Sequence, residues 1–158
     1  MIDSTYVVSL AAYNRWQNEN LFGCAAALSD ADRKLDCGAF FKSIHHTLNH
    51  ILWADETWMS RFTLSAPPAT PHSESQFLHE DWSTLRAART KLDDTMEAWA
   101  ATVDPAWLAR SSTGRWTRSN GFLVAHMFNH QTHHRGQVHA LLTAAGASPS
   151  DTDLLKLP

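Results

Sequence analysis

Four long stretches in which apolar residues recur every three or four positions constrain this chain more than any other feature. They cover residues 4–28, 42–62, 78–103 and 121–145. This spacing is typical of helices that bury one face. Helices of these lengths span about 30 to 40 Å at 1.5 Å per residue, which are the dimensions of a four-helix bundle. The pattern predicts an all-α fold and, over residues 1–158, a single domain.

The segments between the periodic stretches carry turn residues. Residues 66–71 read Ala-Pro-Pro-Ala-Thr-Pro and cannot continue a helix, so they predict a long crossover between the second and third helices. Residues 73–76 have capping-box spacing and predict the start of the third helix, which Pro105 would end. Residues 107–119, with Gly114 and the alternating Trp116-Thr117-Arg118, fit either a long loop or a short hairpin. The end of the chain, 154–157, either docks on the bundle or forms an oligomer contact.

Composition excludes several classes of protein. The formal net charge of -3 leaves no positive excess for binding nucleic acid. No run of apolar residues is long enough to span a membrane, and the first residues lack a signal-peptide pattern. The two cysteines, Cys24 and Cys37, do not form a C-x-x-C motif and fit a reduced compartment. We therefore expect a cytoplasmic protein.

Histidine clustering indicates where the chemistry lies. Of the ten histidines, eight fall in two of the periodic stretches, namely His45, His46, His50, His126, His130, His133, His134 and His139. His130 and His134 occupy inward positions of the last helix. Residues four apart lie on one face with Cβ atoms about 5 to 6 Å apart, so these two imidazoles could share a metal ion. The alternative is a pair of hydrogen-bonded core histidines without a metal.

A third ligand would come from the second helix, where periodicity leaves the choice open. A helical wheel favours His45, whereas His50 lies on a second stripe of small residues that would face inward if this helix is buried on two sides. Three histidines with an open fourth position are typical of a catalytic metal site. In a zincin motif the residue after the first histidine is Glu, and here it is Gln131, so zincin chemistry is disfavoured.

Residues 43–55, SIHHTLNHILWAD, and 129–138, NHQTHHRGQV, resemble the DinB family of bacterial four-helix-bundle proteins. The resemblance extends to residues 13–16, YNRW, and to the tail, and so covers most of the chain. It implies one divalent metal ion held by His50, His130 and His134, and a homodimer. Gln131 stands where the family often has Glu, which puts an acid-base role at that position in doubt.

The resemblance also implies activities. Some members are similar to thiol-dependent S-transferases that use low-molecular-weight thiols, so the leading hypothesis is a metal-dependent S-transferase acting on an electrophilic small molecule, or a metal-dependent hydrolase. The metal would be zinc, nickel or iron. The alternative is a non-catalytic stress-response bundle in which the metal contributes stability, or a dimer scaffold only.

Other polar and aromatic residues have less specific patterns. We expect His45, His46, His133 and His139 to be solvated or at the rim of the bundle, and His126 to line or cap a pocket. Asp55 would accept a hydrogen bond from a ligand imidazole or from Arg15, or lie at the surface. Arg135 would bind an anion or, as we favour, pair with Asp55 or Glu56. Trp53 and Trp58 could wall a substrate site.

Overall fold

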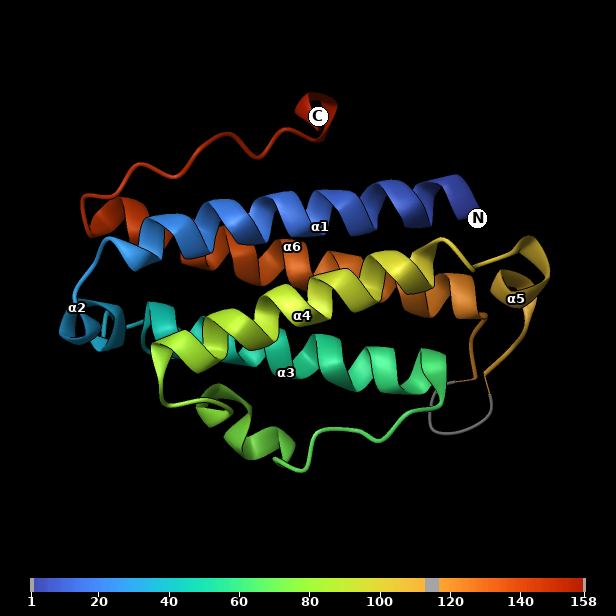
Figure 1. Ribbon diagram of the computed structural model, residues 1–158, viewed down its shortest axis with the longest axis horizontal. Coiled ribbons are helices and arrows are strands. Elements are labelled where there is room, and N and C mark those ends of the chain that lie inside the picture. Colours follow the sequence, from blue (N-terminus) through green and yellow to red (C-terminus); the bar gives the residue numbers. More distant parts are fainter. Residues whose placement is uncertain (1, 113–116, 158) are drawn as a thin grey trace.

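The computed structural model describes residues 2–112 and 117–157. Four long helices dominate it: α1 (Ser4–Ala26), α3 (Ile44–Thr63), α4 (Trp82–Ala100) and α6 (Asn120–Ala144). Shorter elements are α2 (Asp30–Lys34), α5 (Pro105–Ala109) and the 3-10 helices η1 (His72–Phe77) and η2 (Leu154–Lys156). The expectation of an all-α bundle is confirmed (Figure 1).

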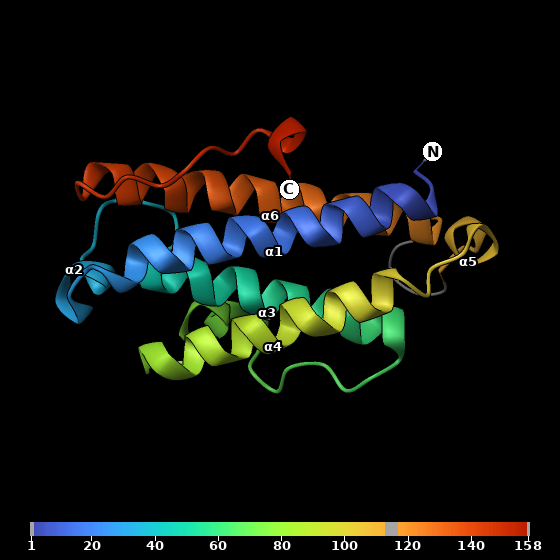
Figure 2. The same cartoon turned by 45° about the horizontal axis from the view of Figure 1, so that its top comes forward.

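The four long helices enclose one apolar core. Contacts link α1 with α4 and α6, and α3 with the same two helices, so the helices pack around a common centre (Figure 2). The core contains fully buried residues from α3, α4 and α6, such as Leu52, Leu85, Met96, Met127 and Leu142. None of the helices in the described part of the chain is long and apolar enough to span a membrane.

A long crossover joins α3 to α4. The colours of Figure 1 show that both helices run in the same direction, so the chain must return along the whole bundle between them. Residues 64–81 make this return, as the prolines predict, and they carry η1 against α3. This arrangement brings a non-periodic segment to the side of α3.

The predicted ends of the third helix are wrong. Residues 73–76 lie in η1, and α4 begins at Trp82 because the side chain of Asp81 caps it, accepting a hydrogen bond from the backbone nitrogen of Thr84 at 2.7 Å. Helix α4 ends at Ala100, and Pro105 begins α5 instead of closing the longer helix.

The two ambiguous segments have definite conformations in the described part of the chain. Ser111 and Ser119 form an isolated antiparallel bridge, which fits the hairpin alternative, whereas Gly114 and Trp116 lie outside the described residues. The tail runs along α1, where the hydroxyl of Tyr13 donates to the carbonyl of Thr152 at 2.6 Å. The chain before residue 154 therefore makes the backbone contact with α1. Of residues 154–157, the first three are exposed, whereas Leu157 is partly buried and packs against the core.

Candidate metal centre

Helices α3 and α6 bring three histidines to one point. His50 comes from α3, and His130 and His134 come from consecutive turns of α6. The Nε2 atoms of His50 and His130 are 3.3 Å apart, and one candidate ligand atom from each histidine lies within 4.8 Å of the others. His50 and His134 are buried and His130 is half-buried. The spacing on α6 thus produces the convergence that it predicted.

Hydrogen bonds orient two of the rings. The Nδ1 atom of His50 is 2.9 Å from the hydroxyl of Ser75, and Nδ1 of His134 is 2.7 Å from the amide oxygen of Gln137. Each bond occupies Nδ1 and leaves Nε2 available as a ligand atom, which is the usual division of roles in a metal-binding histidine. Sequence reasoning missed both partners. The three-residue spacing between His134 and Gln137 could have identified one of them, but no periodic signal marks Ser75.

The three imidazoles are held in the neutral form that binds metals. Burial and the neighbouring His134 and His130 lower the pKa of His50 to about 3. Burial and the neighbouring His134 and His126 lower the pKa of His130 to about 4. Burial also lowers the pKa of His134. At neutral pH none of the three needs to lose a proton before it binds a metal ion.

The donor set fits a divalent metal ion. Two nitrogen ligands about 2.0 to 2.1 Å from a tetrahedral zinc ion would lie roughly 3.3 to 3.4 Å apart, close to the separation of the His50 and His130 nitrogens, which is 3.3 Å. Imidazole nitrogens also suit nickel and iron. Among the described residues, these three histidines form the group that could hold a metal ion. Three protein ligands would leave a fourth coordination position for water or substrate.

Aromatic rings cover the centre. Phe41 stacks on His50 with ring centroids 4.0 Å apart and is tilted against His134 at 5.5 Å. Trp53, which the sequence offers as a wall of a substrate site, lies nearly parallel to His50 with ring centroids 6.4 Å apart. Trp53 also contacts His72, with centroids 5.3 Å apart. Phe41 and His72 come from segments without periodicity, so the sequence did not point to them.

The remaining histidines do not join the cluster. His45 is 1% exposed, which contradicts the expected rim position, because its Nε2 atom bonds to the carbonyl of His79 at 2.9 Å. The helical wheel was therefore right that His45 points inward, but it faces the crossover and not the metal centre. His46 and His139 are half-buried, and His133 is exposed as expected.

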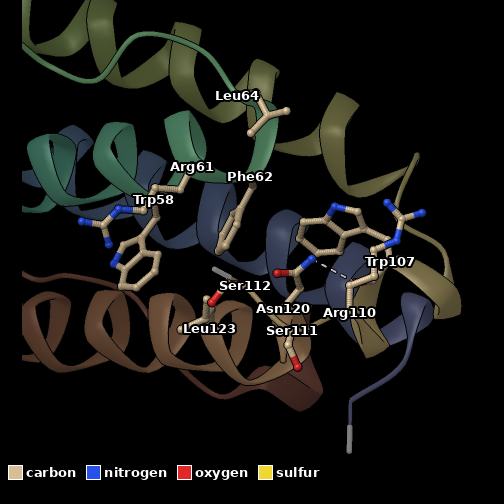
Figure 3. A pocket seen from close by; sticks show the side chains of 10 residues that line it. All are labelled: Trp58, Arg61, Phe62, Leu64, Trp107, Arg110, Ser111, Ser112, Asn120 and Leu123. Atoms are coloured by element: carbon tan, nitrogen blue, oxygen red, sulfur yellow. Dashed lines mark hydrogen bonds between the residues drawn. The ribbon is translucent and has the colours of Figure 1, made fainter. Parts of the chain in front are cut away.

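A cavity lies farther along the bundle. It has a volume of about 640 Å³ and is lined by the ends of α3 and α6 together with α5 (Figure 3). Trp58 lines it and contacts the exposed His126, whose ring centroid is 5.3 Å away. In Figure 3, Trp58 stands on the opposite side of Phe62 from Trp107. Trp58 therefore walls this cavity and not the histidine cluster.

Asp55 pairs with Arg89, which differs from each sequence expectation. Its side chain is fully buried, and its Oδ2 atom is 2.7 Å from the guanidinium of Arg89. Arg15 pairs instead with Asp94 at 2.6 Å and with Glu97 at 2.8 Å. The periodicity of α3 puts Asp55 on the inward face, where the structure has it, but does not indicate the partner on α4.

Arg135 is buried in the bundle, where its side chain bonds to Asn14. It is 5% exposed and donates a hydrogen bond to the side chain of Asn14, so the expected direct pairing with Asp55 or Glu56 is wrong. Burial lowers the pKa of Arg135 to about 10, while the charge of Asp55 opposes that shift. Gln131 is also fully buried and contacts the sulfur of Met96 at 3.8 Å.

Comparison with known proteins agrees with this architecture. The chain is 25% identical over 158 residues to Protein DinB of Bacillus subtilis (strain 168), which covers 95% of this chain and 92% of that protein. The model of the DinB family matches residues 1–158. The chain therefore belongs to the DinB family.

Proposed function

We propose that this protein is a metal-dependent enzyme in which His50, His130 and His134 hold one divalent ion. The leading activity is a thiol-dependent S-transfer to an electrophilic small molecule, and the second is hydrolysis. In the first, a low-molecular-weight thiol gives up its proton to solvent and its sulfur bonds to an electrophilic carbon, whose leaving group departs with its electron pair. The protein would act in the cytoplasm, as its cysteine content favours, and as a homodimer, as the resemblance implies.

The convergence of three neutral imidazole nitrogens from two helices carries this proposal. The Nε2 atoms of His50 and His130 are 3.3 Å apart, a distance that an N–H···N hydrogen bond would also give. The third nitrogen, from His134, lies within 4.8 Å of both, and this convergence of three favours a shared metal ion. A structural zinc site usually has four protein ligands, whereas three are typical of a site with an open position. When bound, zinc or another divalent ion lowers the pKa of a coordinated water or thiol and so supplies a nucleophile at neutral pH.

The chain's own residues orient the ligands and exclude water. Ser75 and Gln137 hold the rings of His50 and His134 through Nδ1. Phe41 covers a face of His50, and Trp53 lies nearly parallel to the His50 ring with centroids 6.4 Å apart. A low-polarity surround of this kind strengthens the interaction between a metal and an anionic nucleophile.

The first experiment is metal content by plasma mass spectrometry, with tag-free protein purified without chelators. We expect about one equivalent of a transition metal in the wild type and almost none in His130→Ala. His139→Ala is the matched control, because His139 lies on the same helix outside the cluster, and it should retain the metal. Equal metal content in all three proteins, or none after reconstitution, would contradict the proposed site.

A panel of low-molecular-weight thiols and electrophiles then tests the activity. Metal-loaded wild type should consume thiol in the presence of at least one electrophile, or hydrolyse a substrate, and His130→Ala should not. Metal binding that raises thermal stability without any turnover would favour the alternative, a non-catalytic metal-binding bundle in which the ion contributes stability.

A further inference from the structure

A second, smaller cavity lies next to the histidine cluster and shares two side chains, Phe41 and His72, with the surroundings of His50. Its volume is about 370 Å³, and it lies between the turn before α3 and the 3-10 helix η1. The residues that define its character are Phe40, Phe41, Lys42, His46, His72 and Phe77. Four of these are aromatic or imidazole rings from the turn and η1, and His46 adds a fifth from the first turn of α3. Concave sites with mostly apolar walls and few polar groups are typical of small-molecule binding.

Two walls of this cavity are also contacts of the metal centre. Phe41 stacks on His50 with centroids 4.0 Å apart. His72 meets the same ring edge-on at 6.3 Å. A molecule in the cavity would therefore touch side chains that touch a proposed metal ligand. In the part of the chain that the structure describes, the larger cavity is linked to the cluster through one more side chain: its lining residue Trp58 contacts His126, whose ring lies 6.4 Å from that of His130.

The backbone of the turn is strained where it forms the cavity. Lys42 has a φ of 70°, the left-handed region that a non-glycine residue rarely adopts. Two hydrogen bonds of 2.8 Å hold it there, from the Lys42 nitrogen to the Ala39 carbonyl and from the Cys37 nitrogen to the Lys42 carbonyl. Strain of this kind clusters at binding sites, where the surrounding structure maintains it. Phe40 and Phe41 lie within this turn, directly before Lys42.

The aromatic residues around the mouth are exposed to an unusual degree. Phe40 is 80% exposed and Phe77 is 55% exposed, although burying either side chain would be favourable. Phe40 packs edge-on against Phe41 at 4.8 Å, and Phe77 packs edge-on against His46 at 5.0 Å. Each exposed ring thus has an edge-on ring contact with another residue that lines the same cavity. A flat apolar ligand would bury surface that the chain itself leaves open.

Charge restricts the class of ligand further. Lys42 is the one residue with a formal charge among those that line the cavity, and no carboxylate is among them in the described part of the chain. Its nearest anion, Asp36, is 3.9 Å away, and both side chains are more than half exposed, so this ion pair is weak. The ammonium group can therefore pair with a negative group on a ligand.

We propose that this cavity binds the organic substrate of the metal centre, and that this substrate is a small, flat, apolar molecule carrying a negative charge. The assignment rests on the proposed function, because it makes the cavity the approach to the metal. The aromatic walls would hold the apolar part beside His50, and Lys42 would hold the anionic group at the mouth. Phe40, Phe77 and Lys42 are then determinants of specificity, not of metal binding.

Fluorescent probes test the cavity without knowledge of the substrate. Anilinonaphthalene sulfonate is flat, apolar and anionic, and N-phenylnaphthylamine is its uncharged counterpart. We expect the sulfonate to bind metal-loaded and metal-free wild type. Phe40→Ala/Phe77→Ala should weaken binding of both probes roughly tenfold, through lost apolar contact. Lys42→Gln should weaken only the sulfonate, since the uncharged probe has no group for the ammonium to pair with.

The control is Phe122→Ala, which removes another half-exposed phenylalanine, on α6 and outside the cavity. Its probe affinities should equal those of the wild type, and circular dichroism should show that every variant is folded. If the double variant binds both probes as tightly as Phe122→Ala does, the probes bind elsewhere and the proposal is wrong. Equal loss of both probes in Lys42→Gln would contradict the assigned role of its charge.

Cobalt-loaded protein tests whether the cavity serves the metal. The visible absorption of cobalt should change when the sulfonate is added to the wild type, and it should not change in Phe40→Ala/Phe77→Ala at the same concentration. Probe binding in the cavity with an unchanged cobalt spectrum would overturn the link to the metal centre. Failure of cobalt to bind at all would contradict the proposed function, and the titration of metal-free protein would still report on the cavity.

Discussion

Ser75 links the crossover to the candidate metal centre through a single hydrogen bond. It is 1% exposed, and its hydroxyl lies 2.9 Å from Nδ1 of His50. With the serine oxygen accepting the Nδ1 proton, the lone pair of the ring is on Nε2, which faces His130. One buried hydroxyl thus fixes the orientation of a proposed ligand and can accept the proton of the tautomer that binds a metal through Nε2.

Ser75→Ala should therefore weaken metal binding without abolishing it. Loss of a hydrogen-bond partner behind a ligand typically costs about tenfold or more in affinity. The affinity can be measured by competition with a chromophoric chelator. Ser73→Ala is the matched control, because Ser73 is an exposed serine in the same 3-10 helix, and its affinity should stay within about twofold of the wild type. Equal affinities for the two variants would mean that Ser75 does not position His50.

The sequence predicts some residues of the site better than others. His130 and His134 could be predicted because a four-residue spacing on one helix fixes their relative position. His50 could not be chosen by periodicity, because α3 is buried on two sides and its inward faces carry both His45 and His50. Phe41 and Ser75 belong to a turn and a 3-10 helix, whose positions depend on tertiary packing and not on a local repeat.

At the scale of elements, the four long helices follow from periodicity and the pieces that cover the site do not. The predicted first, second and fourth helices end within about two residues of the observed bounds, which is the usual uncertainty of helix ends. The start of α4 was misplaced because two capping signals compete, and Asp81 forms the stronger one with hydrogen bonds from Ser83 and Thr84. The earlier signal marks η1 instead.

The start of α3 offers a test at this scale. Ser43 is fully buried, and its hydroxyl accepts a hydrogen bond from the backbone nitrogen of His46 at 3.1 Å. Ser43→Ala should reduce stability by about 1 kcal/mol, which is a fall in melting temperature of roughly 2 to 4 °C for a chain of this size. Differential scanning calorimetry would measure this fall in melting temperature.

Ser9→Ala makes the same chemical change in the middle of α1, where no helix end depends on the hydroxyl. It should leave the melting temperature unchanged or raise it slightly, because alanine has the higher helix propensity. Similar decreases in the two variants would show that the Ser43 cap contributes no particular stability.

At the scale of the whole molecule, the histidine cluster would act as a cross-link. It joins α3 to α6, two helices far apart in sequence, so bound metal should stabilise the folded bundle. A ligand present at about 100 times its dissociation constant adds roughly 2.7 kcal/mol to the free energy of unfolding. Differential scanning fluorimetry should show this stabilisation in the wild type and none in His130→Ala. A wild-type melting temperature independent of zinc and nickel would contradict a site in the folded protein.

A second set of buried polar groups also holds the bundle together. Arg89 on α4 donates to Asp55 on α3 and to Asp93 one turn later on its own helix, at 2.7 Å in each case. Asn14 and Asn18 of α1 donate to the same Asp93. The negative charges oppose the effect of burial and raise the pKa of Arg89. The guanidinium therefore links α3 to α4, Asp93 adds α1 to this network, and Asn14 extends it to Arg135 on α6.

Arg89→Met should be strongly destabilising, because it removes the cation that forms an ion pair with each of two buried carboxylates. Breaking a buried ion pair by removing one partner costs about 3 to 5 kcal/mol, which urea denaturation at neutral pH would measure. Arg86→Met is the matched control, since Arg86 is exposed on the same helix, and its effect should stay within about 0.5 kcal/mol. Equal stabilities for the two variants would mean that the network contributes little.

The pH dependence of the same variant distinguishes a lost charge from lost packing. Burial already raises the pKa of Asp55, and the charge of Arg89 opposes that rise, so removing Arg89 should raise the pKa further. A group whose pKa is higher in the folded than in the unfolded state favours folding at low pH and loses that contribution as the pH rises through the folded value. The deficit of Arg89→Met relative to wild type should therefore shrink between neutral pH and about pH 5. A deficit that stays constant over this range would indicate a packing defect, because apolar contacts do not titrate.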